Sequence, residues 1–329
     1  MKIAVLGAGA WGTGLAVRWA GTAQVTLWAR NPAQVSEMQA SRLNARYLPG
    51  AALPEPLDLS SDLLQAVSGA DYLIAAVPTS GFRSLLQQLR ELDCRVPLIW
   101  LCKGFEAGSM KLPHTVLAET WPEQAQAGVL SGPSFAQEVA AGQPVALTLA
   151  AAAEDFARQA AQDMHGAALR IYSSSDVIGV EIGGALKNVI AIAAGVCDGL
   201  GFGYNARAAL ITRGLAEMTR LGLKLGGRME TFMGLSGLGD LILTCTADLS
   251  RNRQVGLRLA QGQSLEGILR ELGHIAEGVT TAREVCRLAQ ELAVEMPIAD
   301  AVRRLLDSEL TPKEAVAALL NRHLKDEGV

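Results

Sequence analysis

The stretch Lys2-Ile-Ala-Val-Leu-Gly-Ala-Gly-Ala-Trp-Gly12, near the start of the 329-residue chain, decides the expected fold. Its apolar residues predict a short buried strand, and Gly7, Gly9 and Gly12 follow as G-x-G-x-x-G. That pattern is weak alone, but here it directly follows a strand and opens a helix. Gly7 then permits a tight turn, Gly9 lets the backbone approach a pyrophosphate, and Gly12 lets the helix pack on the strand. We predict a dinucleotide site, with a purely structural glycine turn as the alternative.

Short apolar runs alternate with amphipathic stretches through the first half of the chain. The clearest further strands are 24–30 and 71–77, and Asn31 caps a helix that Pro32 begins. The remaining candidate strands have the same apolar character and lie at 97–102, 127–130, 145–150 and 169–173. Strands that alternate with helices predict an α/β fold: a Rossmann-like domain with a mainly parallel sheet and helices on both faces.

The second half of the chain has a different pattern. From about Val180 the alternation stops, and helical patterns separated by glycine-containing turns follow. This predicts a C-terminal all-helical domain. We place the boundary within 173–179, which gives a nucleotide-binding domain over 1–178 and a helical substrate domain over 179–329.

The composition excludes several classes of protein. Half of the residues are hydrophobic and the formal net charge is −4, which excludes intrinsic disorder and gives no basic surface for nucleic acid or an anionic membrane. The five cysteines form no C-x-x-C pair and the four histidines show no metal spacing, so we expect buried core cysteines and no metal.

The N-terminal apolar run could imitate a signal peptide. However, it carries one basic residue and is interrupted by the glycines of a nucleotide-binding turn. No other stretch offers about 18 uninterrupted apolar residues. We therefore expect a cytoplasmic protein without a membrane-spanning helix.

The end of the second predicted strand bears on the coenzyme. Rossmann proteins specific for NAD usually carry an acidic residue there, whereas this chain has Arg30 followed by the neutral Asn31. A guanidinium can pair with a 2′-phosphate and stack on adenine. This favours NADPH over NADH, and a solvated strand-end arginine is the alternative.

Lys187 is the one cation within the apolar helical stretch 181–195. Helical spacing places four small residues on its face: Gly183, Gly184, Ala191 and Ala194. They would leave a hollow where a substrate could sit. A desolvated lysine loses its proton readily, so Lys187 suits the role of a proton donor. The alternative is a half-buried lysine paired with a carboxylate.

Two further segments carry polar groups that suit an active site. The glycine-rich stretch 234–240 ends in Asp240, which we expect to orient Lys187; a helix N-cap is the alternative. The cluster Ser250-Arg-Asn-Arg253 supplies hydroxyl, guanidinium and amide donors that suit a phosphate. An exposed helix start is the alternative for this cluster.

In this order the segments resemble the bacterial NAD(P)-dependent glycerol-3-phosphate dehydrogenases. The glycine loop is common among dehydrogenases, but a lysine helix followed by G-L-G-D and S-R-N is far more specific. The matching motifs run from residue 7 to residue 278, and only the C-terminal helices lack one. They are Gly7-Ala-Gly-Ala-Trp-Gly-Thr13, Lys103-Gly104, Leu130-Ser-Gly-Pro-Ser-Phe-Ala136, Gly184-Ala-Leu-Lys-Asn188, Gly237-Leu-Gly-Asp240, Thr244-Cys-Thr246, Ser250-Arg-Asn252 and Glu277-Gly278.

The resemblance implies catalysis in a cleft between the two domains. The reaction would be the reversible reduction of dihydroxyacetone phosphate to sn-glycerol 3-phosphate, which feeds phospholipid synthesis. Lys187 would be the general acid/base, while Lys103 and Asp240 would hold charge and orientation around the reacting oxygen. The family also implies a homodimer.

The resemblance also implies two sets of binding residues. Those around the substrate would be Lys103, Gly132, Ser134, Lys187, Asn188, Asp240, Ser250, Arg251 and Asn252. Those around NADP or NAD would be Gly7, Gly9, Ala10, Trp11, Gly12, Arg30, Asn31, Lys103, Ala136, Arg251, Ile275 and Glu277.

Two other functions remain as rivals. A lysine-dependent reductase of the β-hydroxyacid dehydrogenase or ketopantoate reductase type would share the glycine loop and a Lys-Asn helix but would bind a carboxylate. The S-G-P-S and S-R-N segments favour a phosphate instead. A non-catalytic NAD(P)H sensor would have little reason to keep Lys187, Asp240 and Arg251 together.

Overall fold

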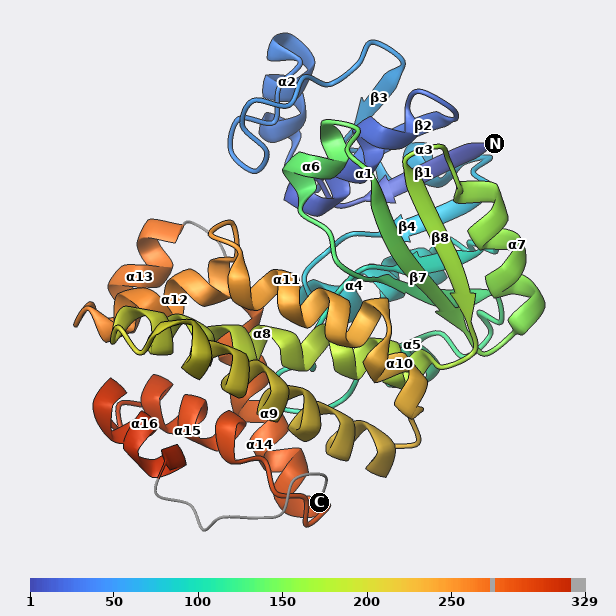
Figure 1. The fold of residues 1–329 in the computed structure, drawn as a ribbon. Helices are drawn as coiled ribbons and strands as arrows, with labels where there is room; N and C mark the ends of the chain where they lie inside the picture. Colours follow the sequence, from blue (N-terminus) through green and yellow to red (C-terminus); the bar gives the residue numbers. More distant parts are fainter. Residues whose placement is uncertain (273–275, 321–329) are drawn as a thin grey trace.

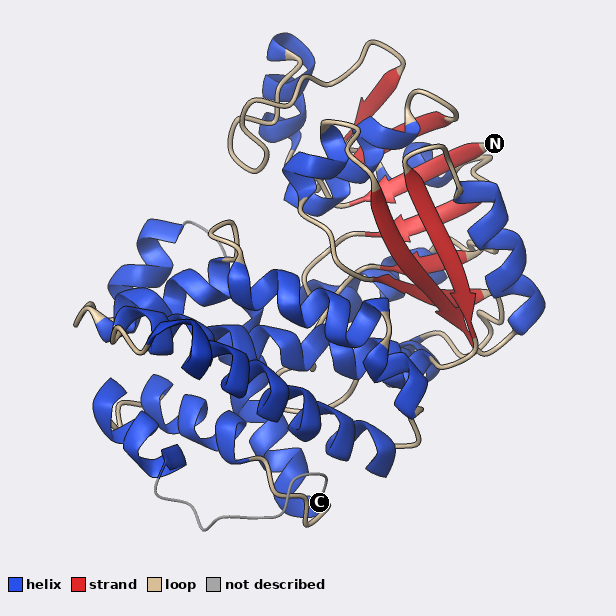
Figure 2. Cartoon of the chain, viewed as in Figure 1, coloured by secondary structure: helices blue, strands red, loops and turns tan. Residues whose placement is uncertain are grey.

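The computed structural model describes residues 1–272 and 276–320. Within them, one sheet and its covering helices form one part of the molecule, here called the sheet half, and a group of helices forms the other, the helical half (Figures 1 and 2). The strands are β1 (Lys2–Leu6), β2 (Gln24–Trp28), β3 (Leu57–Ser60), β4 (Tyr72–Ala75), β5 (Leu98–Trp100), β6 (Ala127–Ser131), β7 (Val145–Ala151) and β8 (Leu169–Ser174).

The helices divide between the two halves. Those of the sheet half are α1 (Ala10–Trp19), α2 (Pro32–Ser41), α3 (Leu63–Val67), α4 (Thr79–Glu91), α5 (Pro113–Thr120), α6 (Ala136–Ala140) and α7 (Glu154–Met164). Those of the helical half are α8 (Val177–Gly199), α9 (Gly203–Lys224), α10 (Met229–Met233), the π-helix η1 (Leu235–Gly239), α11 (Asp240–Thr246), α12 (Arg251–Ala260), α13 (Leu265–Leu272), α14 (Glu277–Glu291), α15 (Pro297–Leu306) and α16 (Pro312–Leu320).

The sheet has the strand order β3-β2-β1-β4-β5-β6-β7-β8. The first six strands are parallel, β7 runs antiparallel to β6, and β8 pairs parallel with β7. The order 3-2-1-4-5-6 is that of doubly wound dinucleotide-binding sheets. The predicted mainly parallel sheet with a C-terminal helical part is therefore confirmed.

Strand β3 was not among the predicted strands. It has four residues, Leu57–Ser60, lies at the edge of the sheet and includes Asp58. A short edge strand buries only part of its surface, so it lacks the continuous apolar run that marks the central strands.

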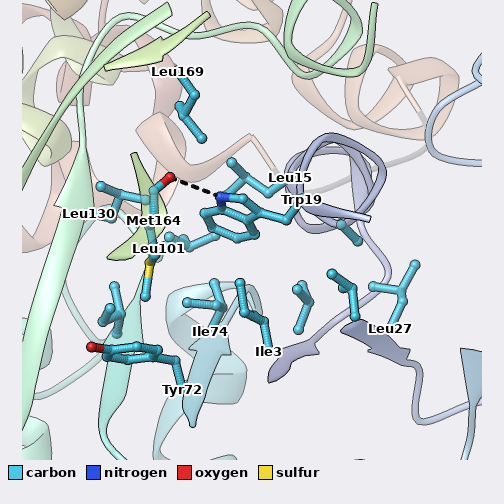
Figure 3. Close-up of a cluster of buried hydrophobic side chains, with 14 of the residues drawn as sticks. Ile3, Leu15, Trp19, Leu27, Tyr72, Ile74, Leu101, Leu130, Met164 and Leu169 are labelled. Carbon is cyan, nitrogen blue, oxygen red and sulfur yellow. Dashed lines mark hydrogen bonds between the residues drawn. The ribbon is translucent and has the colours of Figure 1, made fainter. Parts of the chain in front are cut away.

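Both faces of the sheet are buried, because successive side chains of a strand point to opposite faces. On one face, Ile3 and Leu27 lie among side chains from α1 and α7 (Figure 3). There the Trp19 indole Nε1 donates a hydrogen bond to the Met164 carbonyl at 3.4 Å. On the other face, Leu6 packs in a second cluster with the apolar side of α4.

Helix α8 is the core of the helical half and packs against α9, α11, α12 and α14. By length and composition it could cross a membrane, but 83% of its most apolar 18-residue window is buried inside the protein. Its apolar sequence is interrupted by Glu181, Lys187 and Asp198. We therefore interpret α8 as a buried core helix.

The five cysteines are all free and buried, which confirms their prediction as core residues.

Candidate active site

The glycine turn lies where β1 ends and α1 begins. Gly7 has a φ of +126°, and a Cβ there would lie 2.6 Å from the Ala76 carbonyl oxygen. A Cβ at position 12 would lie 2.1 Å from the Gly7 carbonyl oxygen. Apart from the adjacent chain, no atom of the described residues lies within 4 Å of a Cβ at position 9. Gly7 and Gly12 are thus required by the backbone and its packing, while Gly9 faces open space. This arrangement suits a pyrophosphate that approaches the backbone at the N-terminus of α1.

The other predicted coenzyme residues of the sheet half lie around this turn. Ala10 and Trp11 are half-buried in the first turn of α1, and Arg30 is exposed just after β2. The Asn31 side chain accepts a hydrogen bond from the Ala33 backbone N–H at 3.0 Å, so it caps α2 as predicted. Ala136 begins α6, which packs closely on α1.

Three charged side chains from distant parts of the chain meet at Asp240. Lys187 Nζ on α8 donates to Asp240 Oδ1 at 2.5 Å, and Lys103 Nζ, after β5, donates to Asp240 Oδ2 at 2.7 Å. Asp240 is fully buried at the start of α11, and Lys187 is buried as well. The structure thus brings together the three residues expected to be catalytic.

The burial of this cluster changes its proton affinities. Burial lowers the pKa of Lys187 to about 8, although the Asp240 carboxylate acts in the opposite direction. Burial alone would raise the pKa of Asp240, but Lys103 and Lys187 outweigh it and the pKa is lowered. Asp240 therefore remains charged near neutral pH, while Lys187 can exchange its proton there, as a general acid/base must.

The glycines of α8 have two different surroundings. A Cβ at Gly184 would lie 3.3 Å from Lys103 Cγ and 3.2 Å from Ser131 Oγ, so Gly184 leaves room for the Lys103 side chain. A Cβ at Gly183 would lie 2.3 Å from the Ser236 carbonyl oxygen. The expected hollow is therefore not found at Gly183, because the backbone of η1 fills that space.

Asn188, next to Lys187, begins a chain of amide contacts. Asn252 Nδ2 donates to Asn188 Oδ1 at 2.9 Å, and the Gly278 backbone N–H donates to Asn252 Oδ1 at 3.1 Å. These bonds join α8, α12 and the first turn of α14. Asn252 consequently stands close to the lysine helix, but its amide is engaged within the protein.

The segment 250–253 divides into residues with different roles. Ser250 Oγ accepts a hydrogen bond from the Arg253 N–H at 3.3 Å and caps α12. Arg251 is exposed, whereas Arg253 is buried and bonded to Asp198 and Asp248. Arg253, which the sequence grouped with the phosphate donors, is thus turned into the protein.

Gly132 and Ser134 lie just after β6. Gly132 has a φ of +140°, and the Ser134 hydroxyl donates to its carbonyl at 3.1 Å. The neighbouring Ser131 hydroxyl is buried and has no hydrogen-bond partner among residues 1–272 and 276–320. A ligand seated beside Lys103 would find this unpaired hydroxyl close by.

Glu277 is the first residue of α14. The pKa of Glu277 is raised, because the effect of burial outweighs the lowering by the positive charges of Arg251, Lys103 and Lys187. It is therefore electrostatically part of the same cluster. Ile275, the other coenzyme residue expected in this segment, lies outside the described residues.

A second buried carboxylate, not singled out from the sequence, joins the two halves. Glu181 Oε1 on α8 accepts hydrogen bonds from Trp100 Nε1 and from the His114 backbone N–H, both at 2.9 Å. The His114 ring also contacts this carboxylate; burial lowers the pKa of His114, but Glu181 raises it more. The contact anchors β5, which precedes Lys103, to the helix that carries Lys187.

Among the described residues, no group of three His, Cys, Asp or Glu side chains could hold a metal ion.

Two family matches together cover most of the chain. Residues 2–157 match the family described as NAD-dependent glycerol-3-phosphate dehydrogenase N-terminus, and residues 176–317 match its C-terminus. The glycerol-3-phosphate dehydrogenase (NAD(P)+) of Thiobacillus denitrificans is 62% identical over 327 residues, which cover 99% of this chain and all of that one. The enzyme of the same name from Dechloromonas aromatica is 57% identical, with 99% of each chain covered.

Solved structures give the same result. A crystal structure of glycerol-3-phosphate dehydrogenase from Coxiella burnetii has a TM-score of 0.93 and 42% identity, and covers 98% of this chain and 99% of that one. A ketopantoate reductase from Ralstonia eutropha has a TM-score of 0.60 at 17% identity, covering 96% of this chain and all of that one. The second likeness is one of fold alone.

Proposed function

Because the chain belongs to the NAD-dependent glycerol-3-phosphate dehydrogenase family, we propose that it catalyses the reversible reduction of dihydroxyacetone phosphate to sn-glycerol 3-phosphate with NAD(P)H. The product supplies the backbone of glycerophospholipids. One observation carries this proposal: the buried Lys103–Asp240–Lys187 cluster is joined through Asn188 to the S-R-N turn of α12. A proton donor and a set of phosphate donors are thereby held on adjoining helices.

The coenzyme would be held by the glycine turn, with Ala10, Trp11 and Ala136 around it. The open space at Gly9 and the positive φ of Gly7 support this fit. We favour NADPH, because the exposed Arg30 offers a cation to a 2′-phosphate where NAD-specific proteins usually have an acid. When bound, the nicotinamide supplies the hydride for the reduction.

Lys187 donates the proton that the substrate's carbonyl oxygen acquires during reduction. Its lowered pKa allows this transfer near neutral pH, and Asp240 holds its ammonium group in place. Lys103 is bonded to the other carboxylate oxygen of Asp240. It adds positive charge near the substrate's carbonyl oxygen, on which negative charge develops during reduction.

The phosphate is a remote handle that orients the reacting carbonyl. At the N-terminus of α12, a position that favours an anion, the donors would be the Arg251 guanidinium, the Ser250 O–H and the N–H of Asn252 Nδ2 that is not bonded to Asn188. Gly132 and Ser134, which follow β6, would complete the substrate site. Binding energy from this non-reacting group can be used to position the carbonyl next to Lys187.

We also propose how the chain is organised. A nucleotide-binding domain over 1–178 and a helical domain over 179–329 are supported by the end of β8 at Ser174 and the start of α8 at Val177. We infer a cytoplasmic homodimer; the free, buried thiols favour a reducing compartment, and the dimer rests on the family alone.

One assay tests the function against both rivals. Oxidation of NADPH and of NADH is followed with dihydroxyacetone phosphate, with ketopantoate, and without substrate. We expect consumption only with dihydroxyacetone phosphate, faster with NADPH. Oxidation of the coenzyme with ketopantoate alone would indicate a carboxylate-binding reductase. No oxidation with either substrate would favour a non-catalytic sensor.

A further inference from the structure

Helix α12, which carries the proposed phosphate donors at its first turn, crosses α8 at very short range. A Cβ on Gly195 would lie 1.9 Å from the Arg253 carbonyl oxygen, and a Cβ on Gly256 would lie 1.9 Å from the Ile192 carbonyl oxygen. The two backbones therefore touch directly. At this crossing, the separation of the helices is fixed, but rotation and tilt of α12 still need side-chain contacts to define them.

Arg253 supplies those contacts. Its Nε and one terminal nitrogen lie 2.8 and 2.7 Å from Asp198 Oδ2 on α8, and the other terminal nitrogen lies 2.7 Å from Asp248 Oδ1. Arg207 of α9 donates to the same Asp198 oxygen at 3.0 Å. Asp198 stands eleven residues after Lys187, about three helical turns, so both lie on one side of α8.

Neighbouring residues of α12 thus point in different directions. Arg251 is exposed, Asn252 contacts Asn188, and Arg253 is held beside Asp198. We propose that Arg253 is a positioning residue for the phosphate subsite: by holding the first turn of α12 against Asp198, it fixes where Arg251 and Asn252 stand relative to Lys187. This inference rests on the proposed function.

The geometry requires arginine rather than any cation. Two N–H groups of the planar guanidinium point to the Asp198 carboxylate and a third donates to Asp248. Arg253 therefore connects α12 to α8 and to the turn before α12 at the same time. A lysine is a single point charge on a flexible stem and cannot reproduce this fork. Arg253→Lys therefore keeps the charge but loses the orientation of α12.

The test compares a phosphorylated with an unphosphorylated substrate. In Arg253→Lys and Arg253→Gln we expect kcat/KM for dihydroxyacetone phosphate to fall at least about tenfold, because misplacement by about 1 Å can cost 100-fold. The kcat/KM for dihydroxyacetone, which lacks the phosphate, should stay within about twofold. Asp198→Asn should give the same selective loss, since it removes the other partner of the contact.

Arg258→Gln is the matched control. Arg258 lies on the same helix but pairs with the exposed Glu271, so its removal should leave both substrates unaffected. An equal fall for both substrates in the Arg253 variants would show a merely structural role and overturn the inference, as would an unchanged preference for phosphate. Thermal midpoints identify any variant that does not fold; Arg253→Lys and Asp198→Asn then decide. If the wild-type protein itself fails to reduce dihydroxyacetone phosphate, the proposed function falls instead.

Discussion

The two halves of the molecule would handle their ligands by different means. In the sheet half the candidate coenzyme site is made of backbone: Gly7 and Gly12 shape a turn, and Gly9 leaves it open. The candidate reaction site is instead made of charged side chains held away from water. Asp240 and Lys187 come from the helical half, and Lys103 reaches Asp240 from the sheet half. A backbone site tolerates few changes of shape, whereas a charge cluster tolerates few changes of proton affinity.

The largest effect should come from the charge cluster. Lys187→Ala removes the proposed proton donor, and we expect kcat for dihydroxyacetone phosphate to fall by about 10²–10⁴-fold. Binding of NADPH, measured by fluorescence titration, should remain, because the coenzyme turn lies in the other half. Lys111→Ala, which removes a lysine paired with Glu119, serves as the control. Near-normal turnover in Lys187→Ala would remove that lysine from the mechanism.

The backbone site can be divided by two glycine substitutions. Gly12→Val has no space for its side chain, so the free energy of unfolding should drop by about 1–3 kcal/mol or more in urea titrations. Gly9→Ala has space and should leave stability almost unchanged, yet weaken NADPH binding at least about tenfold, because its methyl group stands where a pyrophosphate approaches. Equal destabilisation by both would contradict this division.

The pH dependence examines the charge cluster more closely. Lys187 must be protonated to act in reduction, so kcat should be constant below its pKa of about 8 and fall about tenfold per pH unit above it. Oxidation of glycerol 3-phosphate needs the neutral amine and should show the opposite limb. Asp240→Asn removes the charge that raises the pKa of Lys187, so the falling limb should move to lower pH. A limb that moves to higher pH would refute the assigned coupling.

The smallest effect concerns the 2′-phosphate on the adenosine part of NADPH. Arg30→Ala should raise the Kd of NADPH about tenfold, the value of one charge-assisted hydrogen bond, and leave that of NADH within about twofold. Arg95→Ala is the control, because Arg95 is an exposed arginine that precedes β5, at the amino ends of the parallel strands, whereas Arg30 follows the carboxyl end of β2. Similar weakening of both coenzymes would show that Arg30 does not contact a 2′-phosphate.

The sheet half was largely predictable from the sequence, because strands buried on both faces are continuous apolar runs. The apolar runs predicted β1, β2 and β4 to β8. They could not predict that β7 runs antiparallel to β6, because strand direction depends on pairing between strands. The edge strand β3 has too little buried surface to stand out.

The helical half was predictable in type but not in its contacts. Lys187 was conspicuous as a single cation in an apolar helix, and Asp240 as an acid among glycines. The pairs Arg253–Asp198 and Glu181–Trp100 are 55 and 81 residues apart, and no local pattern connects them. The π-helical turn η1 has no sequence periodicity from which it could be predicted. Because the backbone of η1 fills the space beside Gly183, the absence of a hollow there could not be predicted either.

The apolar character of α8 has a consequence for synthesis of the chain. Its last residue is Gly199, but α14, one of the helices that cover it, ends at Glu291. About 90 residues must therefore be added before α8 is fully enclosed, which takes roughly 5–18 s at translation rates of 5–20 residues per second. During that interval a segment with the hydropathy of a membrane helix has no complete cover. Nascent chains that stop near Gly199 should bind chaperones, whereas chains extended beyond Glu291 should not.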